Sequence, residues 1–100
     1  MTNLDDLNQK LDRIITELLP PIRAEKRVPT DAFNDLLELL DQFEKHLAKE
    51  EVVPKVLVGT LWFIFTSVLA EADHAKEPGP ILNAAWTLQE KLRVIFGPRF

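Results

Sequence analysis

The chain has 100 residues, of which 46% are hydrophobic and 28% are charged, and its formal net charge is −4. This length fits a single domain, and this composition excludes a wholly disordered chain. The absence of cysteine excludes disulfide scaffolds and thiolate metal sites, and the acidic balance argues against direct binding of nucleic acid or anionic lipid. The first ten residues are acidic and amphipathic, unlike an export signal, which predicts a cytoplasmic protein.

The first predicted helix covers residues 3–19. Leucine and isoleucine recur there at spacings of three and four residues, the pattern of a helix with one apolar face. Pro20 and Pro21 are expected to end this helix, because a proline inside a helix removes a hydrogen bond and clashes with the preceding turn. Residues 22–28 should then form a basic connection to the next helix.

The second predicted helix covers residues 30–50. Its apolar positions share one face, and the opposite face carries a stripe of acidic residues: Asp31, Asp35, Glu38 and Asp41. Residues 29–51 hold seven Asp or Glu against two Lys, so the negative charge of the chain is concentrated here. This surface would attract a basic protein partner, although an ordinary solvated helix face has the same composition.

The third predicted helix covers residues 54–74 and contains no charged residue from Val56 to Ala70. Its broad apolar face should be the centre of the core. A narrower second face carries Val56, Gly59, Phe63, Ser67 and Ala70, mostly small residues around one large ring. Either the fourth helix or a second molecule should cover that face. The apolar stretch is shorter than the roughly 20 residues that cross a bilayer, so we expect no membrane span.

The fourth predicted helix covers residues 80–96, between a Pro-Gly-Pro break and Gly97. Trp86 lies away from its core face, with Leu82 and Arg93 on the same flank. Tryptophan and arginine are enriched in interface hot spots, so these three residues are a candidate binding surface. Alternatively, the C-terminal tail or the 20–29 connection folds over Trp86.

Four amphipathic helices with short links predict an all-α, single-domain antiparallel four-helix bundle over residues 1–100, with a largely buried third helix. No composition shift or internal repeat indicates a second domain.

Enzymatic motifs are absent from the sequence. The three glycines are far apart, which excludes glycine-rich phosphate loops, and neither histidine has the setting of a nucleophilic triad. Glu71 and His74 have the Glu-x-x-His spacing of bundle metal sites, but such sites need a second pair, which only a dimer would supply. We therefore expect no enzymatic activity and no cofactor.

The sequence favours a non-enzymatic protein-interaction domain. Its most concrete form is an acidic inhibitor of a basic protein, because immunity proteins that neutralise bacterial nuclease toxins have the same small, acidic profile. The acidic stripe would then cover the partner, with Trp86 as a secondary anchor. Two alternatives remain: a structural homodimer that packs through Phe63 and its small neighbours, and a metal-dependent enzyme built on Glu71 and His74.

Overall fold

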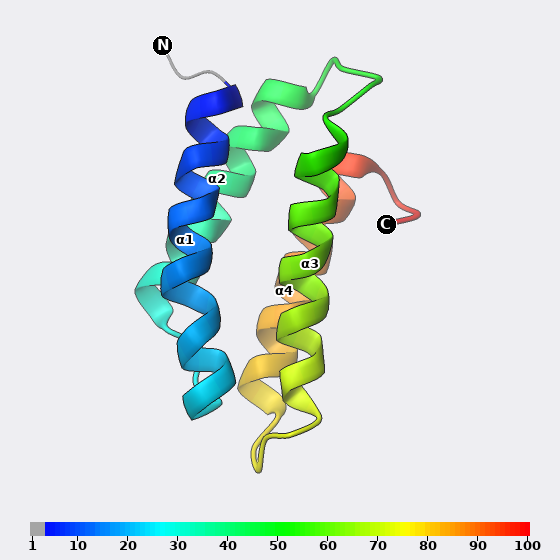
Figure 1. Ribbon diagram of the computed structural model, residues 1–100. Helices are drawn as coiled ribbons and strands as arrows, with labels where there is room; N and C mark the ends of the chain where they lie inside the picture. Colours follow the sequence, from blue (N-terminus) through cyan, green and yellow to red (C-terminus); the bar gives the residue numbers. More distant parts are fainter. Residues whose placement is uncertain (1–3) are drawn as a thin grey trace.

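The computed structural model describes residues 4–100 and confirms the predicted all-α four-helix bundle (Figure 1). The helices are α1 (Leu4–Glu25), α2 (Thr30–Leu47), α3 (Lys55–Ala72) and α4 (Gly79–Phe96). Any helical structure at residue 3, where the first helix was expected to begin, lies outside the described residues.

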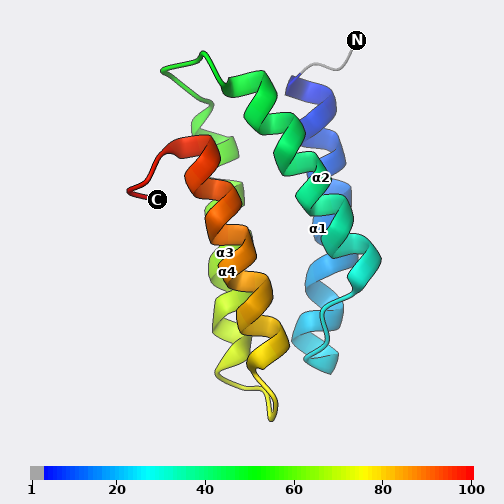
Figure 2. The ribbon, with the colours of Figure 1, turned by 180° about the vertical axis from the view of Figure 1, so that it is seen from behind.

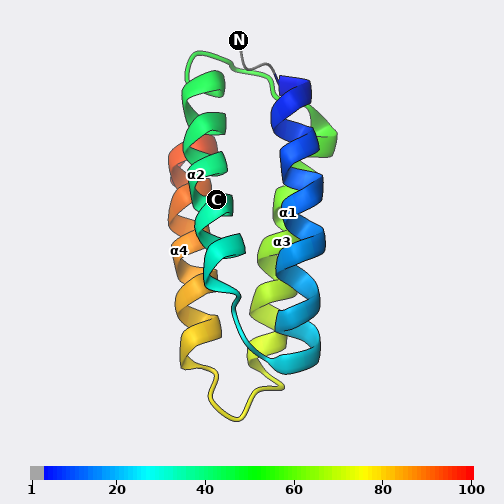
Figure 3. The ribbon, with the colours of Figure 1, turned by 90° about the vertical axis from the view of Figure 1, so that its left-hand side faces the viewer.

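The bundle consists of two antiparallel hairpins, α1–α2 and α3–α4, which stand side by side (Figures 1 and 2). Between the hairpins, α1 packs on α3 and α2 packs on α4. The connection over residues 48–54 therefore crosses the end of the bundle diagonally (Figure 3). Consecutive helices are antiparallel as predicted, while the neighbours across the hairpins run parallel. The outer face of α1–α2 consequently lies opposite the outer face of α3–α4.

All four helices contribute to one hydrophobic core. Every buried side chain in residues 4–100 is hydrophobic, and none is polar or charged. Fully covered side chains come from each helix, including Leu18, Phe43, Ile64 and Ile81. The apolar faces predicted from the 3.6-residue period therefore meet in the middle of the bundle. No group from another molecule is needed to complete this core.

The predicted end of the first helix at Leu19 is wrong, because α1 continues through Pro20 and Pro21 to Glu25. The prolines leave the carbonyls of Thr16 and Glu17 without their helical donors, but those two residues are exposed, so water can reach the carbonyls. Beyond the prolines, Ile22 is fully buried. Burial of that side chain offsets part of the cost of the interrupted hydrogen bonds.

The other helix ends differ from the predicted ones by a few residues. The helix α2 stops at Leu47 rather than near residue 50, and α4 begins at Gly79. The helix α3 ends at Ala72, and the N–H groups of Asp73 and His74 then donate to carbonyls three residues earlier. The predicted end at residue 74 thus includes this tighter terminal turn.

The expectation of a largely buried third helix holds on one face only. Of the residues in α3, 33% are buried, and the outer side exposes Val56, Trp62 and Phe63. By length and composition α3 is apolar enough to cross a membrane, but core helices of soluble bundles meet the same criterion. What distinguishes α3 is therefore its outer side, which carries no charged residue from Val56 to Ala70.

Candidate protein-binding surfaces

The first candidate surface is the outer face of the α3–α4 hairpin, where two tryptophans lie. Trp62 of α3 is 51% exposed and Trp86 of α4 is 49% exposed. The ring of Trp62 lies 5.8 Å from that of Phe65 and 5.7 Å from that of Phe100, between centroids. Phe100 follows α4, so Trp62 faces the side of α3 next to α4.

An ion pair locates Trp86 on the same face. Lys91 of α4 donates to Asp41 of α2 at 2.7 Å, which marks the flank of α4 that faces α2. Trp86 precedes Lys91 by five residues, a rotation of about 140° around the helix. That rotation moves Trp86 past the outermost line of α4, toward α3. Both tryptophans therefore belong to the α3–α4 face.

The other two residues predicted beside Trp86 are on this flank as well. Leu82 is partly buried against the core, so it supports the surface from below. Arg93 is bonded to Glu90 at 3.0 Å, an exposed pair one turn apart on α4. The predicted group of Leu82, Trp86 and Arg93 thus lies together.

The C-terminal tail turns onto Trp62 rather than onto Trp86. Gly97 adopts a positive φ of 108°, a conformation suited to glycine, and the chain reverses there. Phe100 then stacks on Phe96, with ring centroids 5.3 Å apart, and meets Trp62 edge-on. Trp62 and this tail contact were not predicted as a site, although Trp62 lies at the margin of the apolar arc and two phenylalanines, Phe96 and Phe100, stand near the C-terminus.

The acidic stripe of α2 does not form one continuous surface. Asp35 and Glu38 line a groove of about 280 Å³ between α1 and α2, facing Lys10 and Arg13 of α1. Asp41 is turned toward α4 by its bond to Lys91. The groove lies on the α1–α2 face, opposite the tryptophans. The structure therefore separates the predicted acidic contact from Trp86, its predicted secondary anchor.

The narrow stripe of α3 stays open rather than covered by α4. Gly59, Phe63 and Ala70 are exposed, and Ser67 is half-buried. The guanidinium of Arg23 in α1 lies 5.8 Å from the centre of the Phe63 ring, a cation–π contact at the edge of the stripe. No atom from elsewhere in the described chain lies within 4 Å of where a Cβ of Gly59 would stand.

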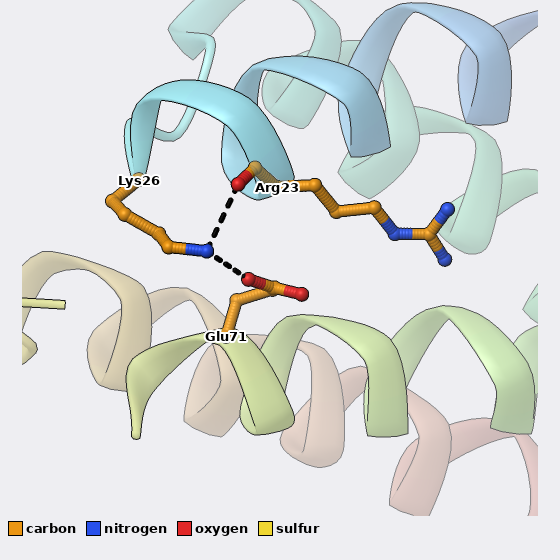
Figure 4. Close-up of polar contacts among 3 residues, drawn as sticks. All are labelled: Arg23, Lys26 and Glu71. Atoms are coloured by element: carbon orange, nitrogen blue, oxygen red, sulfur yellow. Dashed lines mark hydrogen bonds and ion pairs between the residues drawn. The ribbon is translucent and has the colours of Figure 1, made fainter. Parts of the chain in front are cut away.

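Glu71 of α3 forms an ion pair with Lys26, the residue that follows α1. The Lys26 ammonium donates to the Glu71 carboxylate and also to the carbonyl of Arg23, at 2.9 Å in the latter case (Figure 4). Lys26 follows α1 with a positive φ of 53°, which positions its side chain toward α3. His74 is exposed beyond the end of α3. Within residues 4–100, no three His, Cys, Asp or Glu residues gather as metal ligands.

The hydrogen bond from Lys26 lowers the pKa of Glu71 below its ordinary value of 4.5, and the nearby charges of Lys26, His74 and Arg23 lower that pKa further. Partial burial opposes this shift by raising the pKa. The ionised carboxylate is therefore favoured in the folded state. Its contribution to stability is present above pH 4.5 and is lost as the pH falls through the lowered pKa.

Replacing Glu71 with glutamine is expected to reduce the stability of the protein at neutral pH, with the difference from wild type disappearing in acid. Urea denaturation of both proteins over a pH series measures this difference. Glu77→Gln, at an exposed position on the same end of the bundle, is the control. A difference between wild type and Glu71→Gln that stays constant down to the lowest pH would contradict the assignment.

Comparison with protein-family models, with curated protein sequences and with solved structures found no match. Function must therefore be argued from the surfaces of the chain itself.

Proposed function

We propose that this chain is a non-enzymatic protein-interaction domain that binds another protein across its α3–α4 face. The observation that carries this proposal is the presence of two half-exposed tryptophans, Trp62 and Trp86, on one face of a bundle with a complete core. A buried tryptophan removes about 150–250 Å² from water, so both rings retain a large apolar area for a partner. Tryptophan is also the residue type most enriched in binding hot spots.

The neighbours of Trp86 support the same role. Leu82 holds the helix surface against the core, and Arg93 offers a guanidinium at the margin of the aromatic area. An aromatic ring with polar groups at its margin is typical of a protein interface, in which an apolar core is surrounded by a polar rim. The α3–α4 face therefore has both an apolar anchor and a group for directional contacts.

The most concrete form of the proposal is an acidic inhibitor of the immunity type, which neutralises a basic protein such as a nuclease toxin. Its support is the net charge of −4 and the carboxylates of Asp35 and Glu38 in the α1–α2 groove. Because this groove is opposite the tryptophans, we assign the acids to long-range attraction and the α3–α4 face to contact. The net negative charge of the chain speeds the encounter with a basic partner even where the acidic residues do not touch that partner.

Replacing Trp86 with alanine is expected to weaken binding of the partner by about 30-fold or more, the loss typical of a hot spot. Val94→Ala is the matched control, because Val94 is a 64% exposed apolar residue on the other flank of α4. The experiment immobilises wild type, Trp86→Ala and Val94→Ala, exposes them to host extract, and measures affinities for the proteins that wild type retains. Partners bound equally by all three proteins would overturn the proposed contact face.

The same assay tests the acidic form of the proposal. Changing Asp31, Asp35, Glu38 and Asp41 to Asn or Gln is expected to slow association and to reduce its dependence on salt, while dissociation stays close to wild type. Slower association would be consistent with electrostatic attraction of a basic partner. An association rate that the four substitutions leave unchanged would refute the inhibitor form, without affecting the contact face at Trp86.

A further inference from the structure

The outermost line of α3 runs from Lys55 through Gly59, Thr66 and Ala70 to Asp73, with Trp62 on one side and Phe63 on the other; we call this line the α3 ridge. All of these residues except the half-buried Thr66 are exposed. Between the two ends the ridge has no charged residue, whereas its ends carry opposite charges. Lys55 and Asp73 are 18 positions apart, so these charges are separated by about 27 Å along the helix.

Three features of this ridge are unfavourable for an isolated chain. Gly59 lies at an exposed position inside α3, where glycine is less stable than alanine, and no atom of the described chain requires the missing side chain. Lys55 stands at the helix N-terminus and Asp73 at the C-terminus, each at the end whose dipole disfavours its charge. Helical packing within one molecule explains none of the three.

We propose that a second copy of this chain packs on the α3 ridge, with the two α3 helices antiparallel about a two-fold axis. In this arrangement Lys55 of each copy meets Asp73 of the other at both ends of the contact. Trp62 of one copy lies opposite Thr66 of the other, and Gly59 lies near Ala70. The small residues let the helix backbones approach closely, and the antiparallel dipoles attract.

Charge complementarity selects a second copy as the occupant. Each chain carries a net charge of −4, so two copies repel over most of their surfaces. The α3 ridge is uncharged along its length and ends in one positive and one negative group. It is therefore complementary in charge to the ridge of a second copy that runs in the opposite direction. A two-fold axis places the same patch on both subunits, which is what this self-complementary pattern requires.

Charge reversal at the two ends tests this arrangement. Sedimentation equilibrium over a hundredfold range of concentration should give a dimer for wild type. Lys55→Asp and Asp73→Lys alone should each raise the dissociation constant about tenfold or more, because two opposite-charge pairs become two like-charge pairs. The double variant should recover wild-type affinity, and an equimolar mixture of the two single variants should form a heterodimer.

These variants should not unfold the monomer, because each substitution improves the match between the charge and the helix dipole. Circular dichroism checks that helicity is unchanged, and Lys76→Asp, an exposed change off the ridge, is the control. A monomeric wild type over the whole range would overturn the proposal. Failure of the double variant to recover would overturn the antiparallel arrangement.

A dimer through the α3 ridge would cover Trp62, so in the dimer Trp86 is the exposed tryptophan that meets the partner. The inference goes beyond the proposed function and fails separately from it. Trp86 lies on α4, outside the ridge, so Trp86→Ala should leave the dimer intact while it weakens partner binding. Loss of the dimer in Trp86→Ala would contradict the α3 ridge as the contact.

Discussion

Replacing Phe43 with alanine is expected to lower the free energy of unfolding by about 3–5 kcal/mol. Phe43 lies in α2 with 0% of its surface exposed, at the centre of a core that contains no polar side chain. The substitution removes the transfer free energy of the ring and leaves a cavity that rigid neighbouring helices fill only in part. A domain of this size has a total stability of about 5–15 kcal/mol, so the variant would retain little of it.

Phe33→Ala is the matched control for this prediction, since Phe33 is on the same helix and is only partly buried. Urea denaturation followed by circular dichroism should show a loss for Phe33→Ala well below that for Phe43→Ala. Equal losses in the two variants would mean that the ring of Phe43 does not occupy the centre of the core.

The face that each helix turns toward the core was predictable from the spacing of its apolar residues alone. Leu7, Leu11, Ile14 and Leu18 recur every three or four residues, and all four are buried in the structure. The same spacing places Phe43 on the apolar face of residues 30–50, and Phe43 is buried as well. This succeeds because an amphipathic helix must turn its apolar stripe inward, whichever helices are its neighbours.

The arrangement of the surfaces was not predictable, because it depends on which helices are neighbours. The diagonal connection over residues 48–54 places α2 beside α4, and this contact brings Asp41 to Lys91. It also puts Asp35 and Glu38 on the face opposite Trp86. Helical periodicity describes each segment separately and contains no information on which helices become neighbours. The acidic stripe and Trp86 therefore looked like parts of one binding site.

The proline pair shows a second limit of local rules. A proline inside a helix costs about 3 kcal/mol, which is why the first helix was expected to end before Pro20. Burial of side chains in the folded protein offsets that cost, and a rule that considers only neighbouring residues does not include this burial. The exposed positions of Thr16 and Glu17 let water bond the freed carbonyls, and Ile22 gains full burial. The balance between these terms decides where α1 ends.

Replacing Ile22 with alanine is therefore expected to lower the free energy of unfolding by about 2–5 kcal/mol. Ile22 has 0% of its surface exposed, although it follows both prolines. If the chain beyond Pro21 were an exposed connection, the same change would alter stability by no more than about 0.5 kcal/mol. Urea denaturation of the variant thus distinguishes the two descriptions of residues 22–25.

Ile15→Ala provides the control on the other side of the prolines, at a partly buried position of the same helix. A larger loss for Ile22 than for Ile15 would mean that the segment after the prolines is more tightly packed than a regular part of α1. A larger loss for Ile15 than for Ile22 would mean that residues 22–25 form a loop. Lys26 would then lack the support of this end of α1. Because Lys26 bonds Glu71, the pH dependence predicted for Glu71→Gln would then disappear as well.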